Sequence, residues 1–387
     1  MKPFLFDVTE AEFADNPYPT YRRLRDEAPM YRHEETGLWF MTRYADVELA
    51  MNDYRTFSSA KGNSTMESPL RVGKTLGSMD PPRHDELRRV VQRAFGPARI
   101  EAAGQMVREL TAQKIAELGS SGECDLIADI GRPVLFHALG VLLGLGQEGS
   151  RHAGDLTEGL FHQKQGLLGP VLDPEGFQAI FRYLGEQVTR RSETGGDDLI
   201  SILLEMQQNG APLSEQELVA NMSTVLMAGN ASIGHFFSNL MHALWLHPDQ
   251  RRCVMDNPSL IPSAIEEAVR WDTSTQCFAR QTTTAIELHG NIIPANSRIV
   301  LFYAAANHDE RAIERADQFD IDRKRVRHFG FGLGPHVCAG ATIARVMLKI
   351  MLEQLLPVLG EYELDTSKAT RVEHIMVRGF TSLPMRW

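Results

Sequence analysis

A glycine-rich loop that carries Cys338 and runs directly into an apolar helix constrains this chain more than any other feature. The loop extends from Phe331 to Gly340, and an apolar run with helical spacing follows over residues 343–355. A thiol at the start of a helix meets unpaired backbone N–H groups and the positive end of the helix dipole, and both favour the thiolate. Gly332 and Gly340 let the backbone lie flat against a large partner, while Phe331 can shield the sulfur from water. The pattern predicts a sulfur that binds iron.

Two other interpretations of this loop predict features that the sequence lacks. A phosphate-binding loop should follow a strand and end in Gly-Lys-Ser/Thr, whereas this loop follows the basic stretch 323–327 and ends in Cys-Ala-Gly. A buried structural cysteine leaves the glycines unexplained. A cysteine thiolate is one of the protein ligands of haem iron, so the residues favour a haem-thiolate site with Cys338 as the metal ligand.

The loop resembles the haem-ligand signature of the cytochrome P450 superfamily, Phe-x-x-Gly-x-His/Arg-x-Cys-x-Gly. Three further segments resemble family motifs in the expected order, so that the resemblance covers essentially the whole chain. It implies a mainly α fold with small β-sheets (α+β), a single domain over residues 1–387, and a helical bundle around a buried haem b, iron protoporphyrin IX. The segments are residues 80–95, which resemble the propionate-binding helix; Ala228-Gly229-Asn230, at the oxygen-binding helix; and Glu267 to Arg270, the Glu-x-x-Arg helix, with Arg323 as its second arginine.

The resemblance also implies which residues surround the cofactor. Two propionates at the edge of an apolar slot need paired donors, because isolated charges are costly at low dielectric. The matching positions are His84, Arg88, Arg280 and His336, with Phe331, Gly332 and Gly340 around Cys338. Glu267, Arg270 and Arg323 are expected to form a buried structural triad that supports the ligand loop.

A long helix is expected between Ser214 and Pro248. Ser214 and Glu217 make a capping box, Pro248 ends the helix, and the residues between would span about 45 Å at 1.5 Å per residue. Gly229 in its middle costs about 1 kcal/mol relative to alanine, which favours a bare-backbone requirement; a helix-packing glycine is the alternative. Elsewhere the pattern predicts a helix over 18–28, strands near 31 and 38–42, a loop over 60–78, mostly helix over 83–247, and strands over 281–302 with a turn at 289–291.

The expected oxygen-binding segment departs from the family pattern. The resemblance implies that a widened helix turn there makes room for dioxygen, and that Ala228, Gly229, Asn230 and Ser232 are the catalytic positions. Ala231 stands where the family usually has Asp or Glu, and Ser232 stands where it usually has Thr. Ser232 keeps a hydroxyl, but no carboxylate stands beside it to resupply protons. We therefore expect a rerouted relay, poor coupling of electrons to product, or use of peroxide.

The resemblance implies a haem-thiolate monooxygenase that inserts one oxygen atom from O2 into a small, mostly apolar substrate by hydroxylation or oxidative dealkylation. Electrons would come from a separate ferredoxin or flavodoxin and its NAD(P)H reductase, because no such domain is attached. A peroxygenase, an isomerase or an oxidative-coupling enzyme stays open because of Ala231 and Ser232. A haem sensor, or a metal protein that uses His328, His336 and Cys338 as ligands, also stays open as an alternative. The predicted substrate pocket contains Phe161, Leu226, Ile233, Phe278 and Phe380.

Charge and composition limit the partners and the compartment. A formal net charge of -10 argues against nucleic acid, and no stretch reaches the roughly 18 apolar residues of a membrane span. Four widely spaced cysteines indicate a reducing compartment, so a cytoplasmic protein is expected. The basic residues around the Cys338 loop have two equally weighted interpretations: a docking surface for an acidic electron-donor protein, or a solvated basic surface. Its residues are Arg89, Arg93, Arg323, Lys324, Arg325, Arg327, Arg345 and Lys349.

Overall fold

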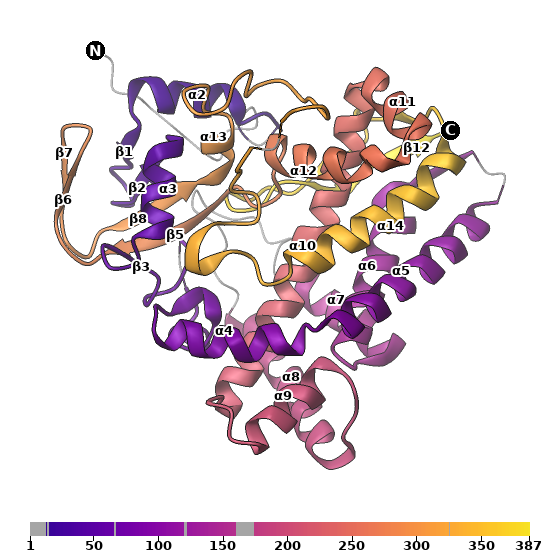
Figure 1. Ribbon diagram of the computed structural model, residues 1–387, viewed down its shortest axis with the longest axis horizontal. Helices are drawn as coiled ribbons and strands as arrows, with labels where there is room; N and C mark the ends of the chain where they lie inside the picture. The colour runs from indigo at the N-terminus through magenta and orange to yellow at the C-terminus, as the bar shows by residue number, and fades with distance from the viewer. Residues whose placement is uncertain (1–12, 14, 66, 120–121, 160–173, 325) are drawn as a thin grey trace.

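The computed structural model describes residues 13–387 apart from positions 14, 66, 120–121, 160–173 and 325. The side chains of residues 158–159, 174 and 230–231 also lie outside the description. Within the described part, helices form most of the molecule and a small sheet lies at one edge (Figure 1). The predicted mainly α architecture with small sheets is confirmed.

The predicted helix over 18–28 and the predicted mostly helical region 83–247 are confirmed. A short strand, Glu123–Asp125, interrupts this helical region and was not predicted. The α-helices are α2 (Tyr18–Glu27), α3 (Tyr44–Asn52), α4 (Arg83–Ala94), α5 (Pro97–Leu118), α6 (Arg132–Leu142), α7 (Gly146–Gly159), α8 (Pro174–Thr194), α9 (Leu199–Gln208), α10 (Glu215–Leu246), α11 (Pro248–Asp256), α12 (Ile261–Trp271), α13 (Tyr303–Asn307) and α14 (Ala341–Leu359). Shorter turns of helix are η1 (Leu76–Ser78), η2 (Leu126–Gly131), η3 (Pro258–Leu260) and η4 (Gly334–His336).

Among the described residues, the strands form one five-stranded sheet and three smaller ones. The large sheet has the order β1-β2-β8-β5-β3, in which β2 and β8 are parallel and the other pairs are antiparallel. The predicted turn at 289–291 joins β6 to β7. The strands are β1 (Met30–Arg32), β2 (Trp39–Met41), β3 (Phe57–Ser58), β4 (Glu123–Asp125), β5 (Cys277–Thr282), β6 (Ile286–Leu288), β7 (Asn291–Ile293), β8 (Arg298–Phe302), β9 (Glu363–Leu364), β10 (Thr370–Arg371), β11 (Phe380–Ser382) and β12 (Pro384–Arg386).

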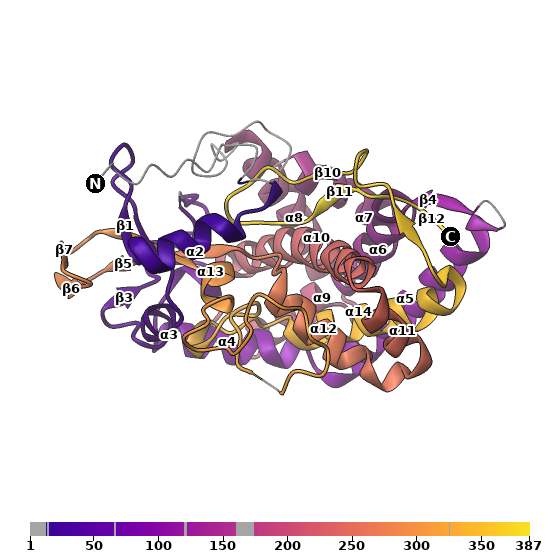
Figure 2. The ribbon, with the colours of Figure 1, turned by 90° about the horizontal axis from the view of Figure 1, so that it is seen from above.

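Helix α10 runs through the middle of the molecule, in contact with α6, α8 and α12 (Figure 2). The predicted capping box begins it: the Glu217 backbone N–H donates to Ser214 Oγ at 3.2 Å, and Ser214 N donates to Glu217 Oε2 at 2.8 Å. Its 32 residues span about 48 Å at 1.5 Å per residue. The helix ends at Leu246, just before the predicted stop at Pro248, and Pro248 begins the next helix. This length lets one helix form a wall of the interior and reach the surface at both ends.

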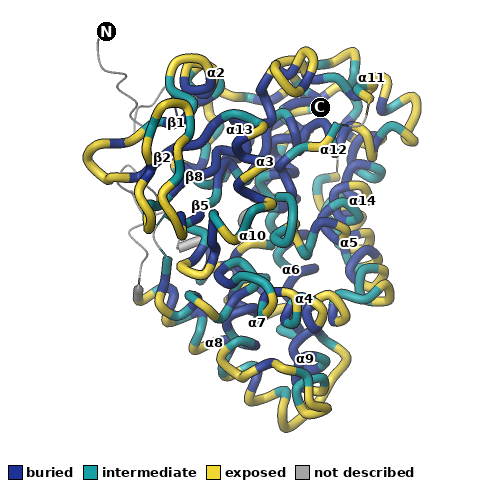
Figure 3. The backbone as a smooth tube through the Cα atoms, turned by 60° about the vertical axis from the view of Figure 1, so that its left-hand side comes forward, coloured by how far each residue is buried: buried dark blue, intermediate teal, exposed yellow. Residues whose placement is uncertain are grey.

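Burial follows the same layout. Buried backbone fills the interior around α10, while the exposed stretches lie at the periphery (Figure 3). In the described part of the chain, no single helix is long and apolar enough to cross a membrane. One bent pair, Leu126–Leu142 with Gly146–Thr157 at 114°, passes that length and composition criterion when its members are taken together.

Candidate functional site

The Cys338 loop forms a tight turn that depends on two glycines. Gly332 has φ +71° and Gly334 has φ +65°, in the left-handed region that other residues rarely adopt. A Cβ on Gly334 would also lie 2.6 Å from the Met51 carbonyl oxygen. The Cys338 N–H donates to the Phe331 carbonyl at 2.7 Å, which closes the loop just before α14. The predicted junction of loop and helix is therefore confirmed.

Cys338 lines a cavity of about 390 Å³ between this loop and α10. Cys338 has a large accessible surface, but that surface faces the internal cavity and not the outside of the protein. Burial raises the pKa of the Cys338 thiol, while the Gly340 and Ala341 N–H groups and the charges of Arg88 and Arg345 act to lower it. The helix-start donors act in the predicted direction, but burial dominates in the protein alone. A bound metal cation would supply the missing positive charge.

The four residues predicted to contact the propionates all line this cavity, although they come from different elements. His84 and Arg88 lie one turn apart on α4, Arg280 lies in β5, and His336 lies in η4. The rings of His84 and His336 are 4.6 Å apart between centroids. Arg88 Nη1 also donates to the carbonyls of Pro335 and Val337, at 3.1 and 2.8 Å, a link to the Cys338 loop that was not predicted.

These residues fit an anionic group. Nε2 of His84 and Nε2 of His336 are buried and have no hydrogen-bond partner among the described residues. Burial is the largest cause that lowers the pKa of His336, to about 2, followed by the charge of Arg280. Burial is the largest cause that lowers the pKa of His84, whereas Asp85 Oδ1, 2.8 Å from His84 Nδ1, acts to raise it; a bound anion at Nε2 would also favour the protonated ring, which donates from both nitrogens. Two arginines and two partnerless histidine nitrogens therefore match the carboxylates of a haem, and Cys338 matches its iron.

On the opposite wall, the predicted catalytic positions Ala228, Gly229 and Ser232 line the same cavity. Ser232 Oγ donates to the Ala228 carbonyl at 2.5 Å. The α-helix is uninterrupted here, so the widened turn implied by the resemblance is not seen. The predicted Asn230 side chain lies outside the description.

Gly229 has a packing role in this structure. A Cβ on Gly229 would lie 2.6 Å from Leu139 Cδ2 of α6. This close approach supports the helix-packing alternative over the bare-backbone requirement for oxygen, because a methyl group there would displace the Leu139 side chain.

Two of the predicted substrate-pocket residues line the cavity and two do not. Ile233 and Phe278 line it. Leu226 and Phe380 are corrections, because both are buried elsewhere in the described structure: Leu226 packs in the core formed with α8 and α9, and the Phe380 ring packs against His242 and under Arg371. Phe161 lies outside the described residues.

Sequence analysis missed several polar lining residues. Arg71 is 9% exposed and pairs with Glu67 at 3.1 Å within the 60–78 loop, while Asn221 and His374 also line the cavity. The resemblance assigned the 60–78 loop to the pocket wall, but it did not single out Arg71 within that loop.

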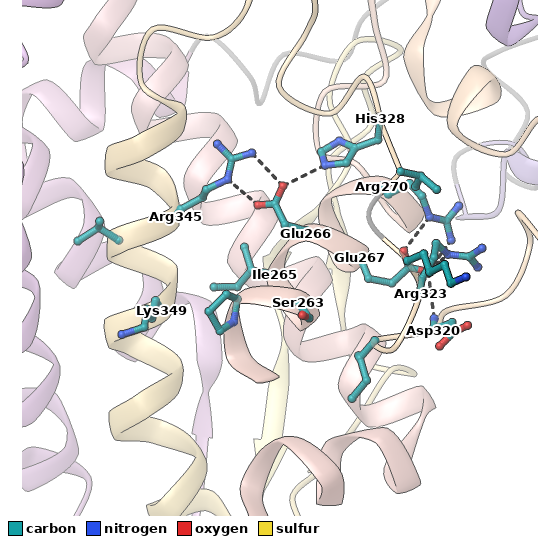
Figure 4. A pocket seen from close by; sticks show the side chains of 15 residues that line it. Ser263, Ile265, Glu266, Glu267, Arg270, Asp320, Arg323, His328, Arg345 and Lys349 are labelled. Carbon is teal, nitrogen blue, oxygen red and sulfur yellow. Dashed lines mark hydrogen bonds and ion pairs between the residues drawn. The ribbon is translucent and has the colours of Figure 1, made fainter. Parts of the chain in front are cut away.

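The three residues of the predicted triad lie together (Figure 4). Glu267 accepts from Arg270 Nη2 at 2.7 Å and from Arg323 Nε at 3.1 Å. The Arg270 side chain is completely buried, and it also donates to the carbonyls of Asn307 and Ala316. One carboxylate thus holds two cations that pin the chain between residues 307 and 323.

The predicted basic dock is only partly available. Arg323 is committed to the triad, Arg327 pairs with Glu48 at 3.0 Å, and Lys349 pairs with Glu353 at 2.7 Å. Arg345 pairs with Glu266, and Arg325 lies outside the description. Arg89, Arg93 and Lys324 are exposed.

A metal site built from His328, His336 and Cys338 is not supported. His328 lies 3.2 Å from Glu266, whereas the His336 ring packs on His84. No group of three or more His, Cys, Asp or Glu side chains that could hold a metal ion occurs among the residues that were placed.

Comparisons with known proteins agree with this geometry. The family model "Cytochrome P450" matches residues 177–385. Mycinamicin IV hydroxylase/epoxidase of Micromonospora griseorubida is 32% identical and aligns over 90% of this chain and 89% of its own length. Cytochrome P450 130 of Mycobacterium tuberculosis is 29% identical over 98% of this chain and 97% of its own. The crystal structure of CYP109E1 from Bacillus megaterium with testosterone superposes with a TM-score of 0.87 at 26% identity, over 97% of this chain and 98% of that one. The chain belongs to the cytochrome P450 family of haem monooxygenases.

Proposed function

We propose that Cys338 is the thiolate ligand of the haem iron and that this enzyme inserts one oxygen atom from O2 into a small, mostly apolar substrate, by hydroxylation or oxidative dealkylation. The observation that carries the proposal is the position of Cys338. Its accessible surface faces an internal cavity whose walls also contain the partnerless Nε2 atoms of His84 and His336. When bound, a haem with a thiolate ligand supplies O–O cleavage and oxidation of C–H bonds.

The residues around the cofactor have distinct roles in this proposal. His84, Arg88, Arg280 and His336 bind the propionates, and Arg88 also holds the Cys338 loop through the Pro335 and Val337 carbonyls. Phe331, which is 7% exposed, excludes water from the sulfur. The loop N–H groups stabilise the thiolate, and the cofactor is haem b.

The substrate contacts the cavity wall formed by α10 residues 228–233 and the part of the large sheet formed by β5. Ile233, Phe278, Phe177 and Leu139 line the cavity together with other apolar side chains, which favours an apolar body. Arg71 and Asn63 also line it, and Arg71 Nε and Asn63 Oδ1 are buried without hydrogen-bond partners in the described structure. One donor and one acceptor match a hydroxyl group, and Glu67 already balances the charge of Arg71. The similarity to an enzyme solved with testosterone supports a rigid, hydroxyl-bearing substrate of this kind.

Electrons come from a separate acidic ferredoxin or flavodoxin and its NAD(P)H reductase. The exposed Arg89, Arg93 and Lys324 form the remaining cationic contacts for such a donor. Reduction rates that fall with salt, and fall further for Arg89→Gln, would support this surface; salt-independent rates would contradict it.

A second candidate function is a peroxide-driven reaction. The described residues that line the cavity contain no Asp or Glu, and Ser232 Oγ is engaged by the Ala228 carbonyl. An enzyme without a carboxylate at this wall must obtain protons by another route, or must accept an oxidant that already carries them. An isomerase or an oxidative-coupling reaction would also reduce the need for a carboxylate that supplies protons at this wall.

The deciding experiment compares two oxidants on haem-loaded protein. Carbon monoxide should first give the thiolate-type Soret band of the ferrous complex. Reductase, ferredoxin and NADPH are then compared with hydrogen peroxide, using a substrate identified by its low-spin to high-spin shift. Product from the reductase system supports the monooxygenase, and product from peroxide alone supports the second candidate. A missing thiolate-type band would contradict both.

A further inference from the structure

Glu266, the neighbour of the triad glutamate, contacts both ends of the Cys338 loop. Its carboxylate accepts from Arg345 Nε at 2.5 Å and from Arg345 Nη2 at 2.9 Å, and His328 Nε2 lies 3.2 Å from Glu266 Oε2 (Figure 4). The Gly330 N–H donates to His328 Nδ1 at 3.2 Å, which leaves Nε2 as the nitrogen that carries hydrogen. His328 precedes the loop and Arg345 follows Cys338 on α14. The Glu266 carboxylate therefore holds the segment before the Cys338 loop, at His328, and the segment after it, at Arg345.

Arg345 extends this contact to the surroundings of the sulfur. Its guanidinium carbon lies 4.2 Å from the centroid of the Phe331 ring, within cation–π range. Phe331 packs on Phe236 at 5.4 Å between centroids, and its carbonyl accepts the Cys338 N–H. The two Glu266 contacts thus fix the Phe331 ring through Arg345 and fix the start of the loop through His328.

The two adjacent glutamates of α12 act on different segments. Glu267 binds Arg270 and Arg323, whose other contacts are carbonyls between residues 307 and 318. Glu266 binds residues 328 and 345, on either side of Cys338. Neighbouring residues on a helix point about 100° apart, so each carboxylate reaches a partner that the other cannot reach.

We propose that Glu266 is a positioning residue that clamps the Cys338 loop at both ends and keeps the sulfur in the geometry required of an iron ligand. This inference rests on the proposed role of Cys338 and adds to it a residue outside the triad. Arginine binds the carboxylate with two parallel N–H donors, and such charge-assisted pairs are geometrically specific. Without the carboxylate, Arg345 is free to leave the Phe331 ring, and water then reaches the sulfur.

The test uses haem-loaded protein with Glu266→Gln and the matched control Glu353→Gln. Glu353 pairs with Lys349 on α14, so its variant removes the same charge near the same helix without loosening the loop. Reduced carbon monoxide spectra are recorded in increasing urea, together with the haem midpoint potential and far-UV circular dichroism. We expect a several-fold larger fraction of the non-thiolate carbonyl form in Glu266→Gln at urea concentrations where helix content is unchanged. We also expect a shift of midpoint potential that the control does not show.

Arg345→Lys and His328→Gln separate the two arms of the clamp and provide folded variants should Glu266→Gln fail to fold. Arg345→Lys keeps the charge but loses the paired donors, so we expect a partial increase of the non-thiolate form. Combining Arg345→Lys with Glu266→Gln should add less than the sum of the two effects. A Glu266→Gln protein that only unfolds at lower urea, with a thiolate-type spectrum and a potential equal to the control, would overturn the clamp. A wild-type protein without the thiolate-type band would instead overturn the proposed function.

Discussion

The two walls of the cavity are stabilised by different forces. The Cys338 wall, residues 331–340, is flanked by charged contacts: Glu266 pairs with His328 before it and Arg345 after it, while Glu267 holds Arg270 and Arg323 earlier in the chain. The α10 wall, residues 228–233, depends on close packing of Gly229 against Leu139 and on hydrogen bonds within the helix. Removing a charge should therefore damage the Cys338 wall, whereas adding a methyl group should damage the α10 wall.

The largest effect is expected at the sulfur. Cys338→His replaces the thiolate with a neutral imidazole, so the thiolate-type carbonyl spectrum and substrate oxidation should both be lost. Visible spectra and product assays measure the change. Cys253→His, at an exposed cysteine, is the control and should leave both unchanged. Retention of the thiolate-type band in Cys338→His would refute the ligand assignment.

The next largest effect is expected for Glu267→Gln, which leaves the buried Arg270 without its anion. Breaking a buried ion pair by removing one partner costs about 3–5 kcal/mol, so we expect a loss of unfolding free energy of that size together with reduced haem content. Urea unfolding and haem quantification measure it. Glu353→Gln should stay within about 0.5 kcal/mol of wild type. Equal losses in the two variants would remove the contrast between buried and exposed charge.

On the α10 wall, Gly229→Ala pushes a methyl group against Leu139, which costs about 1–3 kcal/mol and is partly offset by the gain of about 0.5–1 kcal/mol from alanine in a helix interior. Gly234→Ala is the matched control on the same helix. Its Cβ meets nothing within 4 Å, so alanine should gain about 0.5–1 kcal/mol there. Combining Gly229→Ala with Leu139→Ala should cost less than the sum of the two single losses. If turnover falls while the unfolding free energy is unchanged, the glycine serves oxygen chemistry rather than packing.

The smallest effect is the pH dependence contributed by Glu266. Burial acts to raise its pKa, but hydrogen bonds from Arg345 and His328 outweigh burial and lower the pKa to about 2 from 4.5. Because the folded-state pKa lies below the unfolded value, this stabilisation is complete above about pH 4.5 and is lost as the pH falls towards 2. The difference in urea midpoint between wild type and Glu266→Gln should therefore be larger at pH 6 than at pH 3. A difference that grows on acidification would contradict the sign.

Motifs with local spacing were predicted well. The capping box of Ser214 and Glu217, the helix stop at Pro248 and the loop that carries Cys338 all depend on residues within one or two turns of each other. The meeting of His84, Arg88, Arg280 and His336 at one cavity was inferred from the resemblance, since three separate elements contribute them. The errors concern orientation: Leu226 and Phe380 are apolar like true lining residues, and hydrophobicity does not distinguish a cavity from a core.

Cys338, its glycines and the helix that follows them predicted the chemistry, because the expected thiolate draws on its own loop and the N–H groups of the next helix turn. The tertiary structure decided which charges support that loop and which face solvent. Arg323, Arg327 and Arg345 look alike in the sequence, yet each pairs with a glutamate more than 50 positions away. A long, flexible cation takes its role from the carboxylate that packing brings within 3.1 Å, and that carboxylate has no fixed spacing along the chain.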